Sequence, residues 1–498
     1  MGNADVVIKN GLVYSGTNDP PVKTDIVIKA GYILKIGEDI QAGKIDLIDA
    51  GNLAVAPGFI DIHTHCDENI LESGNNSLKN FITQGITTVV TGNCGMGTFE
   101  VGKLYSKLDS IGTGANIIHL AGHNVIRERV MGMKCRPPDK YELEMMKKIV
   151  SVAMQDGAAG ISTGLFYAPG SYSSTDEIVE LAWVVKEYGG FYASHIRDES
   201  DFTVGLEEAV KEAVYIGEQT GVRVEISHIK ALGKSVWDKS PEICRLIENA
   251  RGRGVYIFAD QYPYGASSTV LSSAIVPGWA IEGGKLMHRL KDPGLIPGIQ
   301  KGITENIVRR GGTESIVIAS CPGDHKFDGK NLQEISTILN IPIIDTVVSL
   351  ILNGDPYIIS YNMKESDIIN FMKKDYVMTG SDGYIEFPGE GVPHPRCYGT
   401  FPHKIRKYVI EDQIISMEDA IRAATSLPAE MTGLKGRGYI KEGYAADIVI
   451  FDPDTIRDNA TYSDPHQYSN GIEYLLVNGE IVIEEGIYNG KLAGRSLR

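Results

Sequence analysis

The chain has 498 residues, of which 43% are hydrophobic and 22% charged, a composition that excludes disordered and fibrous proteins. Its formal net charge of −16 disfavours nucleic acid and anionic membranes as partners. No apolar run reaches the roughly 20 residues that span a bilayer, and the N-terminus lacks a signal-peptide pattern. The six cysteines form no CxxC pair, which indicates reduced thiols. We therefore expect a cytoplasmic protein that acts on a small molecule.

Short alternating apolar runs with glycine turns occupy both ends of the chain. They lie within residues 5–54 and 437–485, where helical periodicity is weak, and this pattern is typical of β-strands. Neither end is long enough to form a stable domain alone. We predict one small β-sandwich domain, built jointly from residues 1–57 and 427–498.

Eight apolar runs, most of them followed by a segment with helical spacing, lie between the two ends. The runs are 59–65, 87–94, 116–123, 159–165, 190–195, 223–228, 255–260 and 377–382. Helical spacing is clearest in 77–85, 140–157, 174–189, 205–221 and 240–254. Parallel strands need crossover helices, so this alternation predicts an α/β fold, a (β/α)₈ TIM-type barrel over residues 58–426.

The seventh and eighth runs are about a hundred residues apart, far more than one crossover needs. We predict an insertion at about residues 270–375, at the end of the barrel that bears the active site. Two interpretations stay open for it: a functional one, as a lid or a specificity subdomain, and that of an extension without a role in the reaction.

Metal-ligating residue types follow several of the predicted strands. In a (β/α)₈ enzyme the ligands come from the carboxyl ends of the strands. His63 and His65 are two apart on the first run, so both side chains point to the same side. His195, His228 and Asp382 end the fifth, sixth and eighth runs. This coincidence predicts a metal site in the mouth of the barrel.

Cys94 follows the second run, in the motif TGNCG. Taken alone, it could equally be a buried structural thiol. Beside four histidines at the barrel rim, however, ligation of a metal by its thiolate is favoured. Cys66 is adjacent to His65 and therefore faces the other way, so we interpret it as a packing residue.

The motifs APGFIDIHTH, ASHIRDE, ISHIK and GSDG resemble the amidohydrolase superfamily, which has a barrel flanked by a split β-domain. TGNCG, STGLFYAPGSYSST, SHIRDES, SHIKALG, ADQYPYGASST, TGSDG and HPRCYGTF, in this order, resemble the N-acyl-D-amino-acid deacylases, or D-aminoacylases. The resemblance covers nearly the whole chain. It implies one tightly bound Zn²⁺ on Cys94, His195 and His228. It also implies a weaker second site on His63 and His65, with Cys94 between the two metals, and Asp382 as the catalytic carboxylate.

The related hydantoinases and dihydroorotases bridge their metals with a carboxylated lysine at the end of strand four. Here that run reads AGISTGLFYAPG and contains no lysine. The difference favours the thiolate class, although a cyclic-amide hydrolase of the hydantoinase or dihydroorotase kind remains the alternative. A non-catalytic barrel is a further alternative, against which the complete set of ligands argues.

An N-acyl amino acid carries a carboxylate, so an acidic protein needs local cations to bind it. Lys230 lies two residues after His228, and Arg396 lies in HPRCYG, where it can offer a bidentate fork. Tyr262, Tyr167 and Ser268 follow predicted strands and could donate hydroxyl hydrogen bonds. An acidic substrate side chain would need one more cation, which the sequence does not place. The preferred side chain and acyl group and the oligomeric state stay open.

The ligand types agree with hydrolysis of an amide. Zinc accepts thiolate and imidazole together, and three protein ligands leave one position open for water. Zinc lowers the pKa of such a water toward about 7, and a nearby carboxylate such as Asp382 can move the proton. We therefore expect a zinc-dependent hydrolase of N-acyl-D-amino acids.

Overall fold

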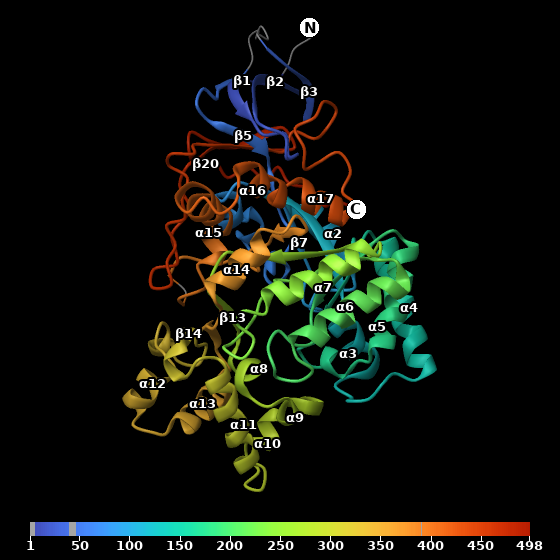
Figure 1. Ribbon diagram of the computed structural model, residues 1–498, viewed down its shortest axis with the longest axis vertical. Coiled ribbons are helices and arrows are strands. Elements are labelled where there is room, and N and C mark those ends of the chain that lie inside the picture. Colours follow the sequence, from blue (N-terminus) through green and yellow to red (C-terminus); the bar gives the residue numbers. More distant parts are fainter. Residues whose placement is uncertain (1–4, 39–45, 390) are drawn as a thin grey trace.

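The structure is a computed structural model that describes residues 5–38, 46–389 and 391–498. Residues 1–4 and 39–45 of the predicted N-terminal β-segment lie outside the described residues. Figure 1 shows three parts along the long axis of the molecule. A sheet built from both chain ends lies at one end, the barrel in the middle, and a largely helical insertion at the other end.

The predicted (β/α)₈ barrel is confirmed. All its neighbouring strands pair in parallel, and the first and last are brought together by a bridge between Thr64 and Gly383. Each predicted run overlaps one strand of the barrel. The strands are β6 (Phe59–Asp61), β7 (Ile86–Thr91), β8 (Asn116–Gly122), β9 (Gly160–Gly164), β10 (Phe191–His195), β11 (Arg223–Ile226), β12 (Ile257–Gln261) and β16 (Val377–Thr379).

Helices cover the outside of the barrel and pack their apolar sides into its core. The five segments with helical spacing form α1 (Lys79–Ile82), α4 (Lys140–Gln155), α5 (Thr175–Glu187), α6 (Leu206–Thr220) and α7 (Ser240–Gly252). Asp139 begins α4 with a capping box to Glu142, and Ser174 caps α5. The other α-helices of this part are α2 (Val101–Ile111), α3 (His123–Met131), α14 (Glu365–Met372), α15 (Arg396–His403), α16 (Met417–Ala424) and α17 (Ser426–Thr432), and a π-helix (Lys404–Glu411) directly follows α15.

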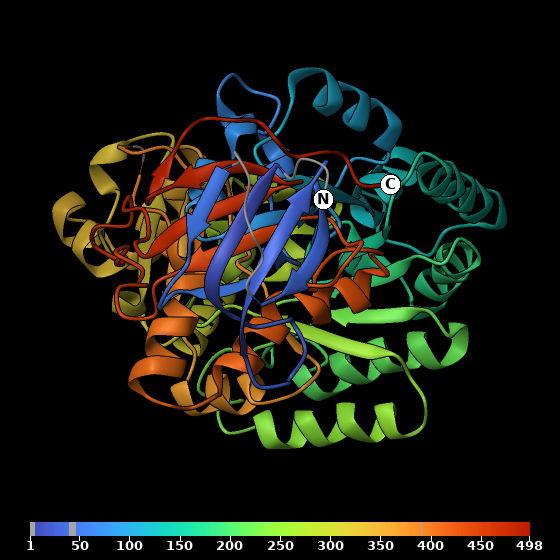
Figure 2. The same cartoon turned by 90° about the horizontal axis from the view of Figure 1, so that it is seen from above.

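The two chain ends form one hydrogen-bonded sheet of nine strands. β5 and β17 pair antiparallel and join the N-terminal strands to the C-terminal ones. Seen from above, the N-terminal strands lie over the C-terminal strands (Figure 2). The strands are β1 (Val6–Val13), β2 (Val22–Lys29), β3 (Tyr32–Gly37), β4 (Asp46–Asp49), β5 (Ala54–Pro57), β17 (Ile448–Phe451), β18 (Ile472–Val477), β19 (Glu480–Glu484) and β20 (Ile487–Tyr488).

Alternating side chains of this sheet serve two different hydrophobic cores. On β17, Val449 and Phe451 join the core of the barrel, whereas Ile448 and Ile450 join a core inside the sheet domain. This follows from the two-residue period of a strand, which sends successive side chains to opposite faces. The sheet is therefore packed onto the barrel rather than tethered to it.

The insertion between β12 and β16 has its own sheet and its own core. Its sheet begins at Ala266, before the predicted start near residue 270, and has the antiparallel order β13, β15, β14. Its elements are β13 (Ala266–Val270), α8 (Leu271–Ile275), α9 (Gly278–Ile281), α10 (Leu286–Arg289), α11 (Ile296–Arg309), β14 (Ile316–Ser320), α12 (Leu332–Leu339), α13 (Ile343–Leu352) and β15 (Tyr357–Tyr361).

Within the described residues, no single helix is both long and apolar enough to cross a membrane. Only α12 and α13 taken together have the length and the apolar composition of a membrane span, and these two helices are bent by 93° at the break between them.

The packing of the sheet on the barrel can be tested at Phe451. Its side chain is fully buried, and its ring lies 6.4 Å from that of Phe59 on the first barrel strand. Replacing a buried phenylalanine by alanine typically costs about 3–5 kcal/mol. We expect Phe451→Ala to lower the free energy of unfolding in urea by that amount. The control Ile487→Ala, at an exposed position of β20, should change it by less than about 0.5 kcal/mol. Equal effects of the two changes would contradict the packing.

Candidate metal centre

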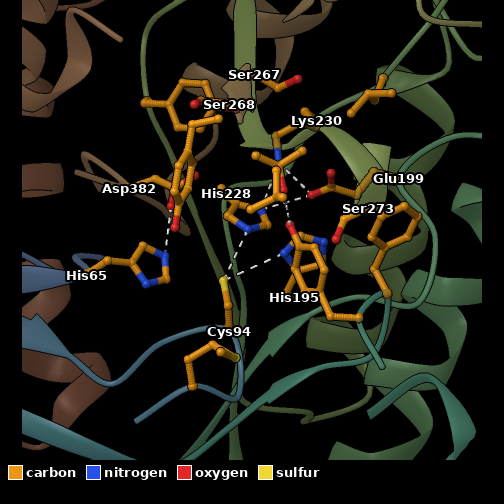
Figure 3. A pocket seen from close by; sticks show the side chains of 18 of the residues that line it. His65, Cys94, His195, Glu199, His228, Lys230, Ser267, Ser268, Ser273 and Asp382 are labelled. Carbon is orange, nitrogen blue, oxygen red and sulfur yellow. Dashed lines mark hydrogen bonds and ion pairs between the residues drawn. The ribbon is translucent and has the colours of Figure 1, made fainter. Parts of the chain in front are cut away.

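The imidazoles of three histidines surround the sulfur of Cys94, and each of the four residues ends or follows a different strand of the barrel. Its Sγ lies 3.5 Å from Nε2 of His63, 3.6 Å from Nδ1 of His195 and 3.6 Å from Nε2 of His228. All four residues are buried. Figure 3 shows His195 and His228 joined to this sulfur by dashed lines. The predicted convergence of strand ends is therefore present in the structure.

The surroundings of Cys94 favour the thiolate. Burial alone would raise the pKa of this thiol, but the charge of His63 and the hydrogen bonds from His195, His228 and His63 hold it well below its ordinary value. Cys66 shows the contrast, because burial and nearby carboxylates raise its pKa to about 12. Of these two neighbouring buried cysteines, only Cys94 has the electrostatics of a metal ligand.

Three site residues have an unusual backbone conformation. Cys94, His228 and Asp382 have positive φ angles of 53°, 39° and 51°. Residues with a side chain seldom adopt this region, which costs about 1–2 kcal/mol, and such positions concentrate in functional sites. Each of the three follows the end of a barrel strand, where the turn directs its side chain back over the mouth.

Asp382 lies at the edge of the same cluster. Its Oδ1 is 3.1 Å from Nε2 of His65, and its Oδ2 is 2.7 Å from Nη1 of Arg396. Burial would raise the pKa of this carboxyl, but the guanidinium of Arg396 and the hydrogen bond from His65 lower it well below the usual range. Asp382 is therefore an ionised carboxylate beside the sulfur and the histidines.

Two carboxylates that we did not predict contact the Nδ1 atoms of two of these histidines. Oδ2 of Asp260 lies 3.0 Å from Nδ1 of His63, and Oε1 of Glu199 lies 2.9 Å from Nδ1 of His228. A carboxylate on the outer ring nitrogen fixes the tautomer of a metal-binding histidine. The sequence contains a feature that could have pointed to each residue: Asp260 ends the seventh apolar run, and Glu199 lies in the motif SHIRDES.

The predicted substrate-binding residues also reach this place. Lys230, Tyr262, Tyr167 and Ser268 line one cavity of about 260 Å³, together with His65, Cys94, His195, His228 and Asp382. His63 is fully buried beneath it. Arg396 lies in an adjoining cavity and reaches the site through Asp382. Lys230 is less available than we expected, since its Nζ lies 2.5 Å from Oε1 of Glu199.

The insertion supplies one wall of this cavity. Ser267, Thr269, Val270, Ser273, Arg310 and Tyr357 line it, in addition to Ser268. Phe166 and Phe202, which follow β9 and β10, line the cavity as well. Sequence reasoning gave only Ser268 of these, because positions in a long insertion carry no periodicity that reveals what they face.

The donor set fits zinc. Three overlapping groups have all their ligand atoms within 4.8 Å of one another: His63 with Cys94 and His228, His63 with His65 and Asp382, and His195 with Glu199 and His228. Buried imidazoles and a thiolate are the ligands that zinc prefers, and the adjoining cavity leaves a side open to water and substrate.

Comparison with known proteins agrees with this geometry. Residues 46–241 and 372–483 match the amidohydrolase family. The D-aminoacylase of Alcaligenes xylosoxydans xylosoxydans is 32% identical, over 99% of this chain and 97% of that protein. The chain belongs to the D-aminoacylase branch of the amidohydrolases. A solved structure of N-acyl-D-glutamate deacylase from Bordetella bronchiseptica, which holds zinc and a phosphonate inhibitor, covers 100% of both chains with a TM-score of 0.86 at 30% identity.

The hydantoinases are more distant from this D-aminoacylase-like chain. D-hydantoinase from Thermus sp. has a TM-score of 0.59 at 16% identity, over 99% of this chain and 98% of that one. This likeness shows a shared fold only. In the present structure the fourth barrel strand, β9, and the loop after it contain no lysine.

The ligand role of Cys94 can be tested by the metal content. We expect the purified protein to contain about one tightly bound zinc per chain, and Cys94→Ala or His228→Ala to lose it, because no neighbouring group can replace a direct ligand. Zinc is measured by plasma mass spectrometry after dialysis. The matched control is Cys66→Ala, which removes the neighbouring buried thiol and should keep the metal. Full zinc occupancy in Cys94→Ala would contradict the assignment.

Proposed function

We propose that this protein is a zinc-dependent deacylase that hydrolyses the amide bond of N-acyl-D-amino acids and releases a carboxylate and a free D-amino acid. One observation carries the proposal: the Cys94 sulfur lies among His63, His195 and His228 beside the ionised Asp382, in a chain of the D-aminoacylase branch. This arrangement combines metal ligands with a group that can move a proton.

Cys94, His195 and His228 would hold one zinc tightly. His63 and His65 would hold a weaker second one, with Cys94 between the two. Asp260 and Glu199 support this assignment, because each orients one of the histidines. When bound, zinc acts as a Lewis acid that lowers the pKa of water toward about 7 and polarises the scissile carbonyl.

Asp382 would transfer the proton. Its lowered pKa keeps it ionised near neutral pH, so it can accept a proton from the attacking water. The same carboxyl then donates this proton to the amide nitrogen as the bond to the acyl carbon breaks. Arg396 and His65 hold the carboxylate from two sides, which fixes the direction of both transfers.

Donors without partners support a binding place for the α-carboxylate of the substrate. The hydroxyl of Tyr262 and the Nε of Arg396 are buried and have no hydrogen-bond partner among the described residues. The guanidinium of Arg396 lies 4.7 Å from the centre of the Tyr262 ring, and the ammonium of Lys230 lies 5.6 Å from it. Buried donors left unsatisfied are costly, and a substrate carboxylate would satisfy them.

Cleavage of linear amides is favoured over opening of cyclic amides. The cysteine occupies the centre of the site, and β9 contains no lysine that could carry a bridging carboxylate. We also propose a cytoplasmic location, which is supported by the six cysteines being unpaired.

Asp382→Asn tests the proton transfer. The amide fills the same space but cannot accept and return a proton, so we expect kcat to fall by about 10² to 10⁴. Zinc content and the circular dichroism spectrum should match those of the wild type, which separates a chemical defect from a folding defect. Near-normal turnover would remove Asp382 from this role.

The handedness of the substrate tests the proposed function as a whole. With the carboxylate and the scissile carbonyl both fixed, inversion of the α-carbon breaks one anchor, and a lost charge-assisted hydrogen bond costs about ten- to a hundredfold in rate. We expect N-acetyl-D-amino acids to be hydrolysed faster than their L-enantiomers by at least that factor, measured as amine released by the zinc-loaded enzyme.

The same assay tests whether Arg396 binds the α-carboxylate of the substrate. Arg396→Met should lower kcat/KM for every D-substrate to a similar degree, because each of them carries the α-carboxylate. Equal hydrolysis of both enantiomers by the wild type, or an unaffected Arg396→Met enzyme, would refute the anchoring scheme.

A further inference from the structure

Three basic side chains lie in the cavity or directly beside it, and two of them are already paired with carboxylates. Lys230 lies 2.5 Å from Glu199, and Arg396 lies 2.7 Å from Asp382. The third is Arg310, which directly follows α11 of the insertion and lines the same cavity. Within the described part of the chain, no carboxylate oxygen lies within 4.0 Å of its guanidinium.

Arg310 is buried, with 2% of its surface exposed. Its Nε donates a hydrogen bond to the carbonyl of Ala274, 3.0 Å away, and its guanidinium lies 5.5 Å from the ring centre of Phe202. Its Nη1 has no partner among the described residues. Burial lowers its pKa to about 10, so it is still charged at neutral pH. A buried cation of this kind is costly unless an anion joins it.

The bound substrate is the anion that can reach Arg310, because this residue lines the cavity in which the amide is cleaved. The position of Arg310 also indicates which part of the substrate it would meet. Ala274, which holds its Nε, is adjacent to Ser273 in α8. Figure 3 shows Ser273 on the Glu199 side of the cavity, across from Asp382 and His65.

The α-carboxylate cannot be the group that reaches this wall. Its carbon is two bonds from the amide nitrogen, which must lie beside Asp382 to receive the proton. The α-carboxylate therefore stays near Arg396, which contacts Asp382 directly. Arg310 makes no such contact with Asp382, and it extends from the insertion rather than from the barrel.

We propose that Arg310 is a specificity-determining residue that binds the side-chain carboxylate of the substrate, so that the enzyme prefers acidic N-acyl-D-amino acids, the derivatives of D-glutamate and D-aspartate. This inference rests on the proposed deacylase function. It assigns a role to the insertion, which brings the missing third cation into the cavity.

The neighbouring Arg309 provides a matched control. It also lies against the ring of Phe202, at 4.9 Å, but its Nε is paired with Asp201 at 2.6 Å and it is partly exposed. It does not line the cavity that holds Asp382 and Cys94. Two adjacent arginines thus share their chemistry and a ring contact, and only one of them has no carboxylate.

The experiment compares kcat/KM for N-acetyl-D-glutamate and N-acetyl-D-aspartate with that for N-acetyl-D-glutamine and N-acetyl-D-asparagine. Each amide has the shape of its acid without the charge. We expect the wild type to prefer the acids by about ten- to a hundredfold, the value of a charge-assisted hydrogen bond. Arg310→Met should abolish this preference and leave hydrolysis of the neutral substrates nearly unchanged. Arg310→Lys should retain part of it, and Arg309→Met should retain all of it.

Hydrolysis of the neutral substrates reports on folding, since a misfolded variant would lose these activities too. A wild type without preference for the acids would overturn the proposal. A uniform loss on all four substrates in Arg310→Met, with thermal unfolding and zinc content unchanged, would also overturn it, because it would place Arg310 on the α-carboxylate.

If the proposed deacylase function is wrong, the outcome is different, because the wild type would then hydrolyse none of the four compounds. In that case, calorimetric binding still decides the role of Arg310. N-acetyl-D-glutamate should bind more tightly than N-acetyl-D-glutamine to the wild type, and with equal affinity to Arg310→Met. Equal affinities in the wild type would overturn the proposal.

Discussion

The site depends on one interaction, a thiolate that is held between imidazoles and is almost entirely buried. Removing a charged sulfur from water is unfavourable, and the contacts of Cys94 with His63, His195 and His228 offset that cost. These contacts require four strand ends to meet within a few ångströms. A closed barrel brings strand ends that are distant in the sequence together around one rim, so the chemistry and the fold impose the same constraint.

The carboxylates around this cluster have two different roles, and the groups that each carboxylate contacts determine its role. Asp260 and Glu199 contact the outer ring nitrogens of two histidines and hold their orientation, whereas Asp382 lies beside the cluster and is the carboxylate that we assign to proton transfer. Asp260 belongs to a strand and is fully buried, so it is rigid. Asp382 instead follows β16 in a turn with positive φ, and this turn brings its carboxylate to the open side. Similar side chains thus differ in role because the backbone places them differently.

Periodicity and order along the chain were sufficient to predict the barrel, because every strand is a short apolar run and strand ends in a barrel always converge. His63, His65, Cys94, His195, His228 and Asp382 could be proposed for the same reason. Glu199 and Arg310 could not be assigned partners in this way. The groups that these two side chains contact depend on how a loop and a long insertion fold over the barrel mouth. No local sequence pattern encodes the distances between groups brought together in this way. An ion pair also changed one expectation. Lys230 lies in the cavity as predicted, but the carboxylate of Glu199 already neutralises its charge.

The sheet shared by the two chain ends affects how the protein is made. β5 ends at Pro57, and its partner β17 begins at Ile448, so the ribosome must add the whole barrel before the two can pair. At about 5–20 residues per second this takes roughly 20–80 s, during which the nascent chain carries an unpaired strand edge beside apolar side chains. Chaperones that shield such edges therefore matter most while the chain is growing. A stop codon anywhere before β17 would leave that edge open for the life of the molecule.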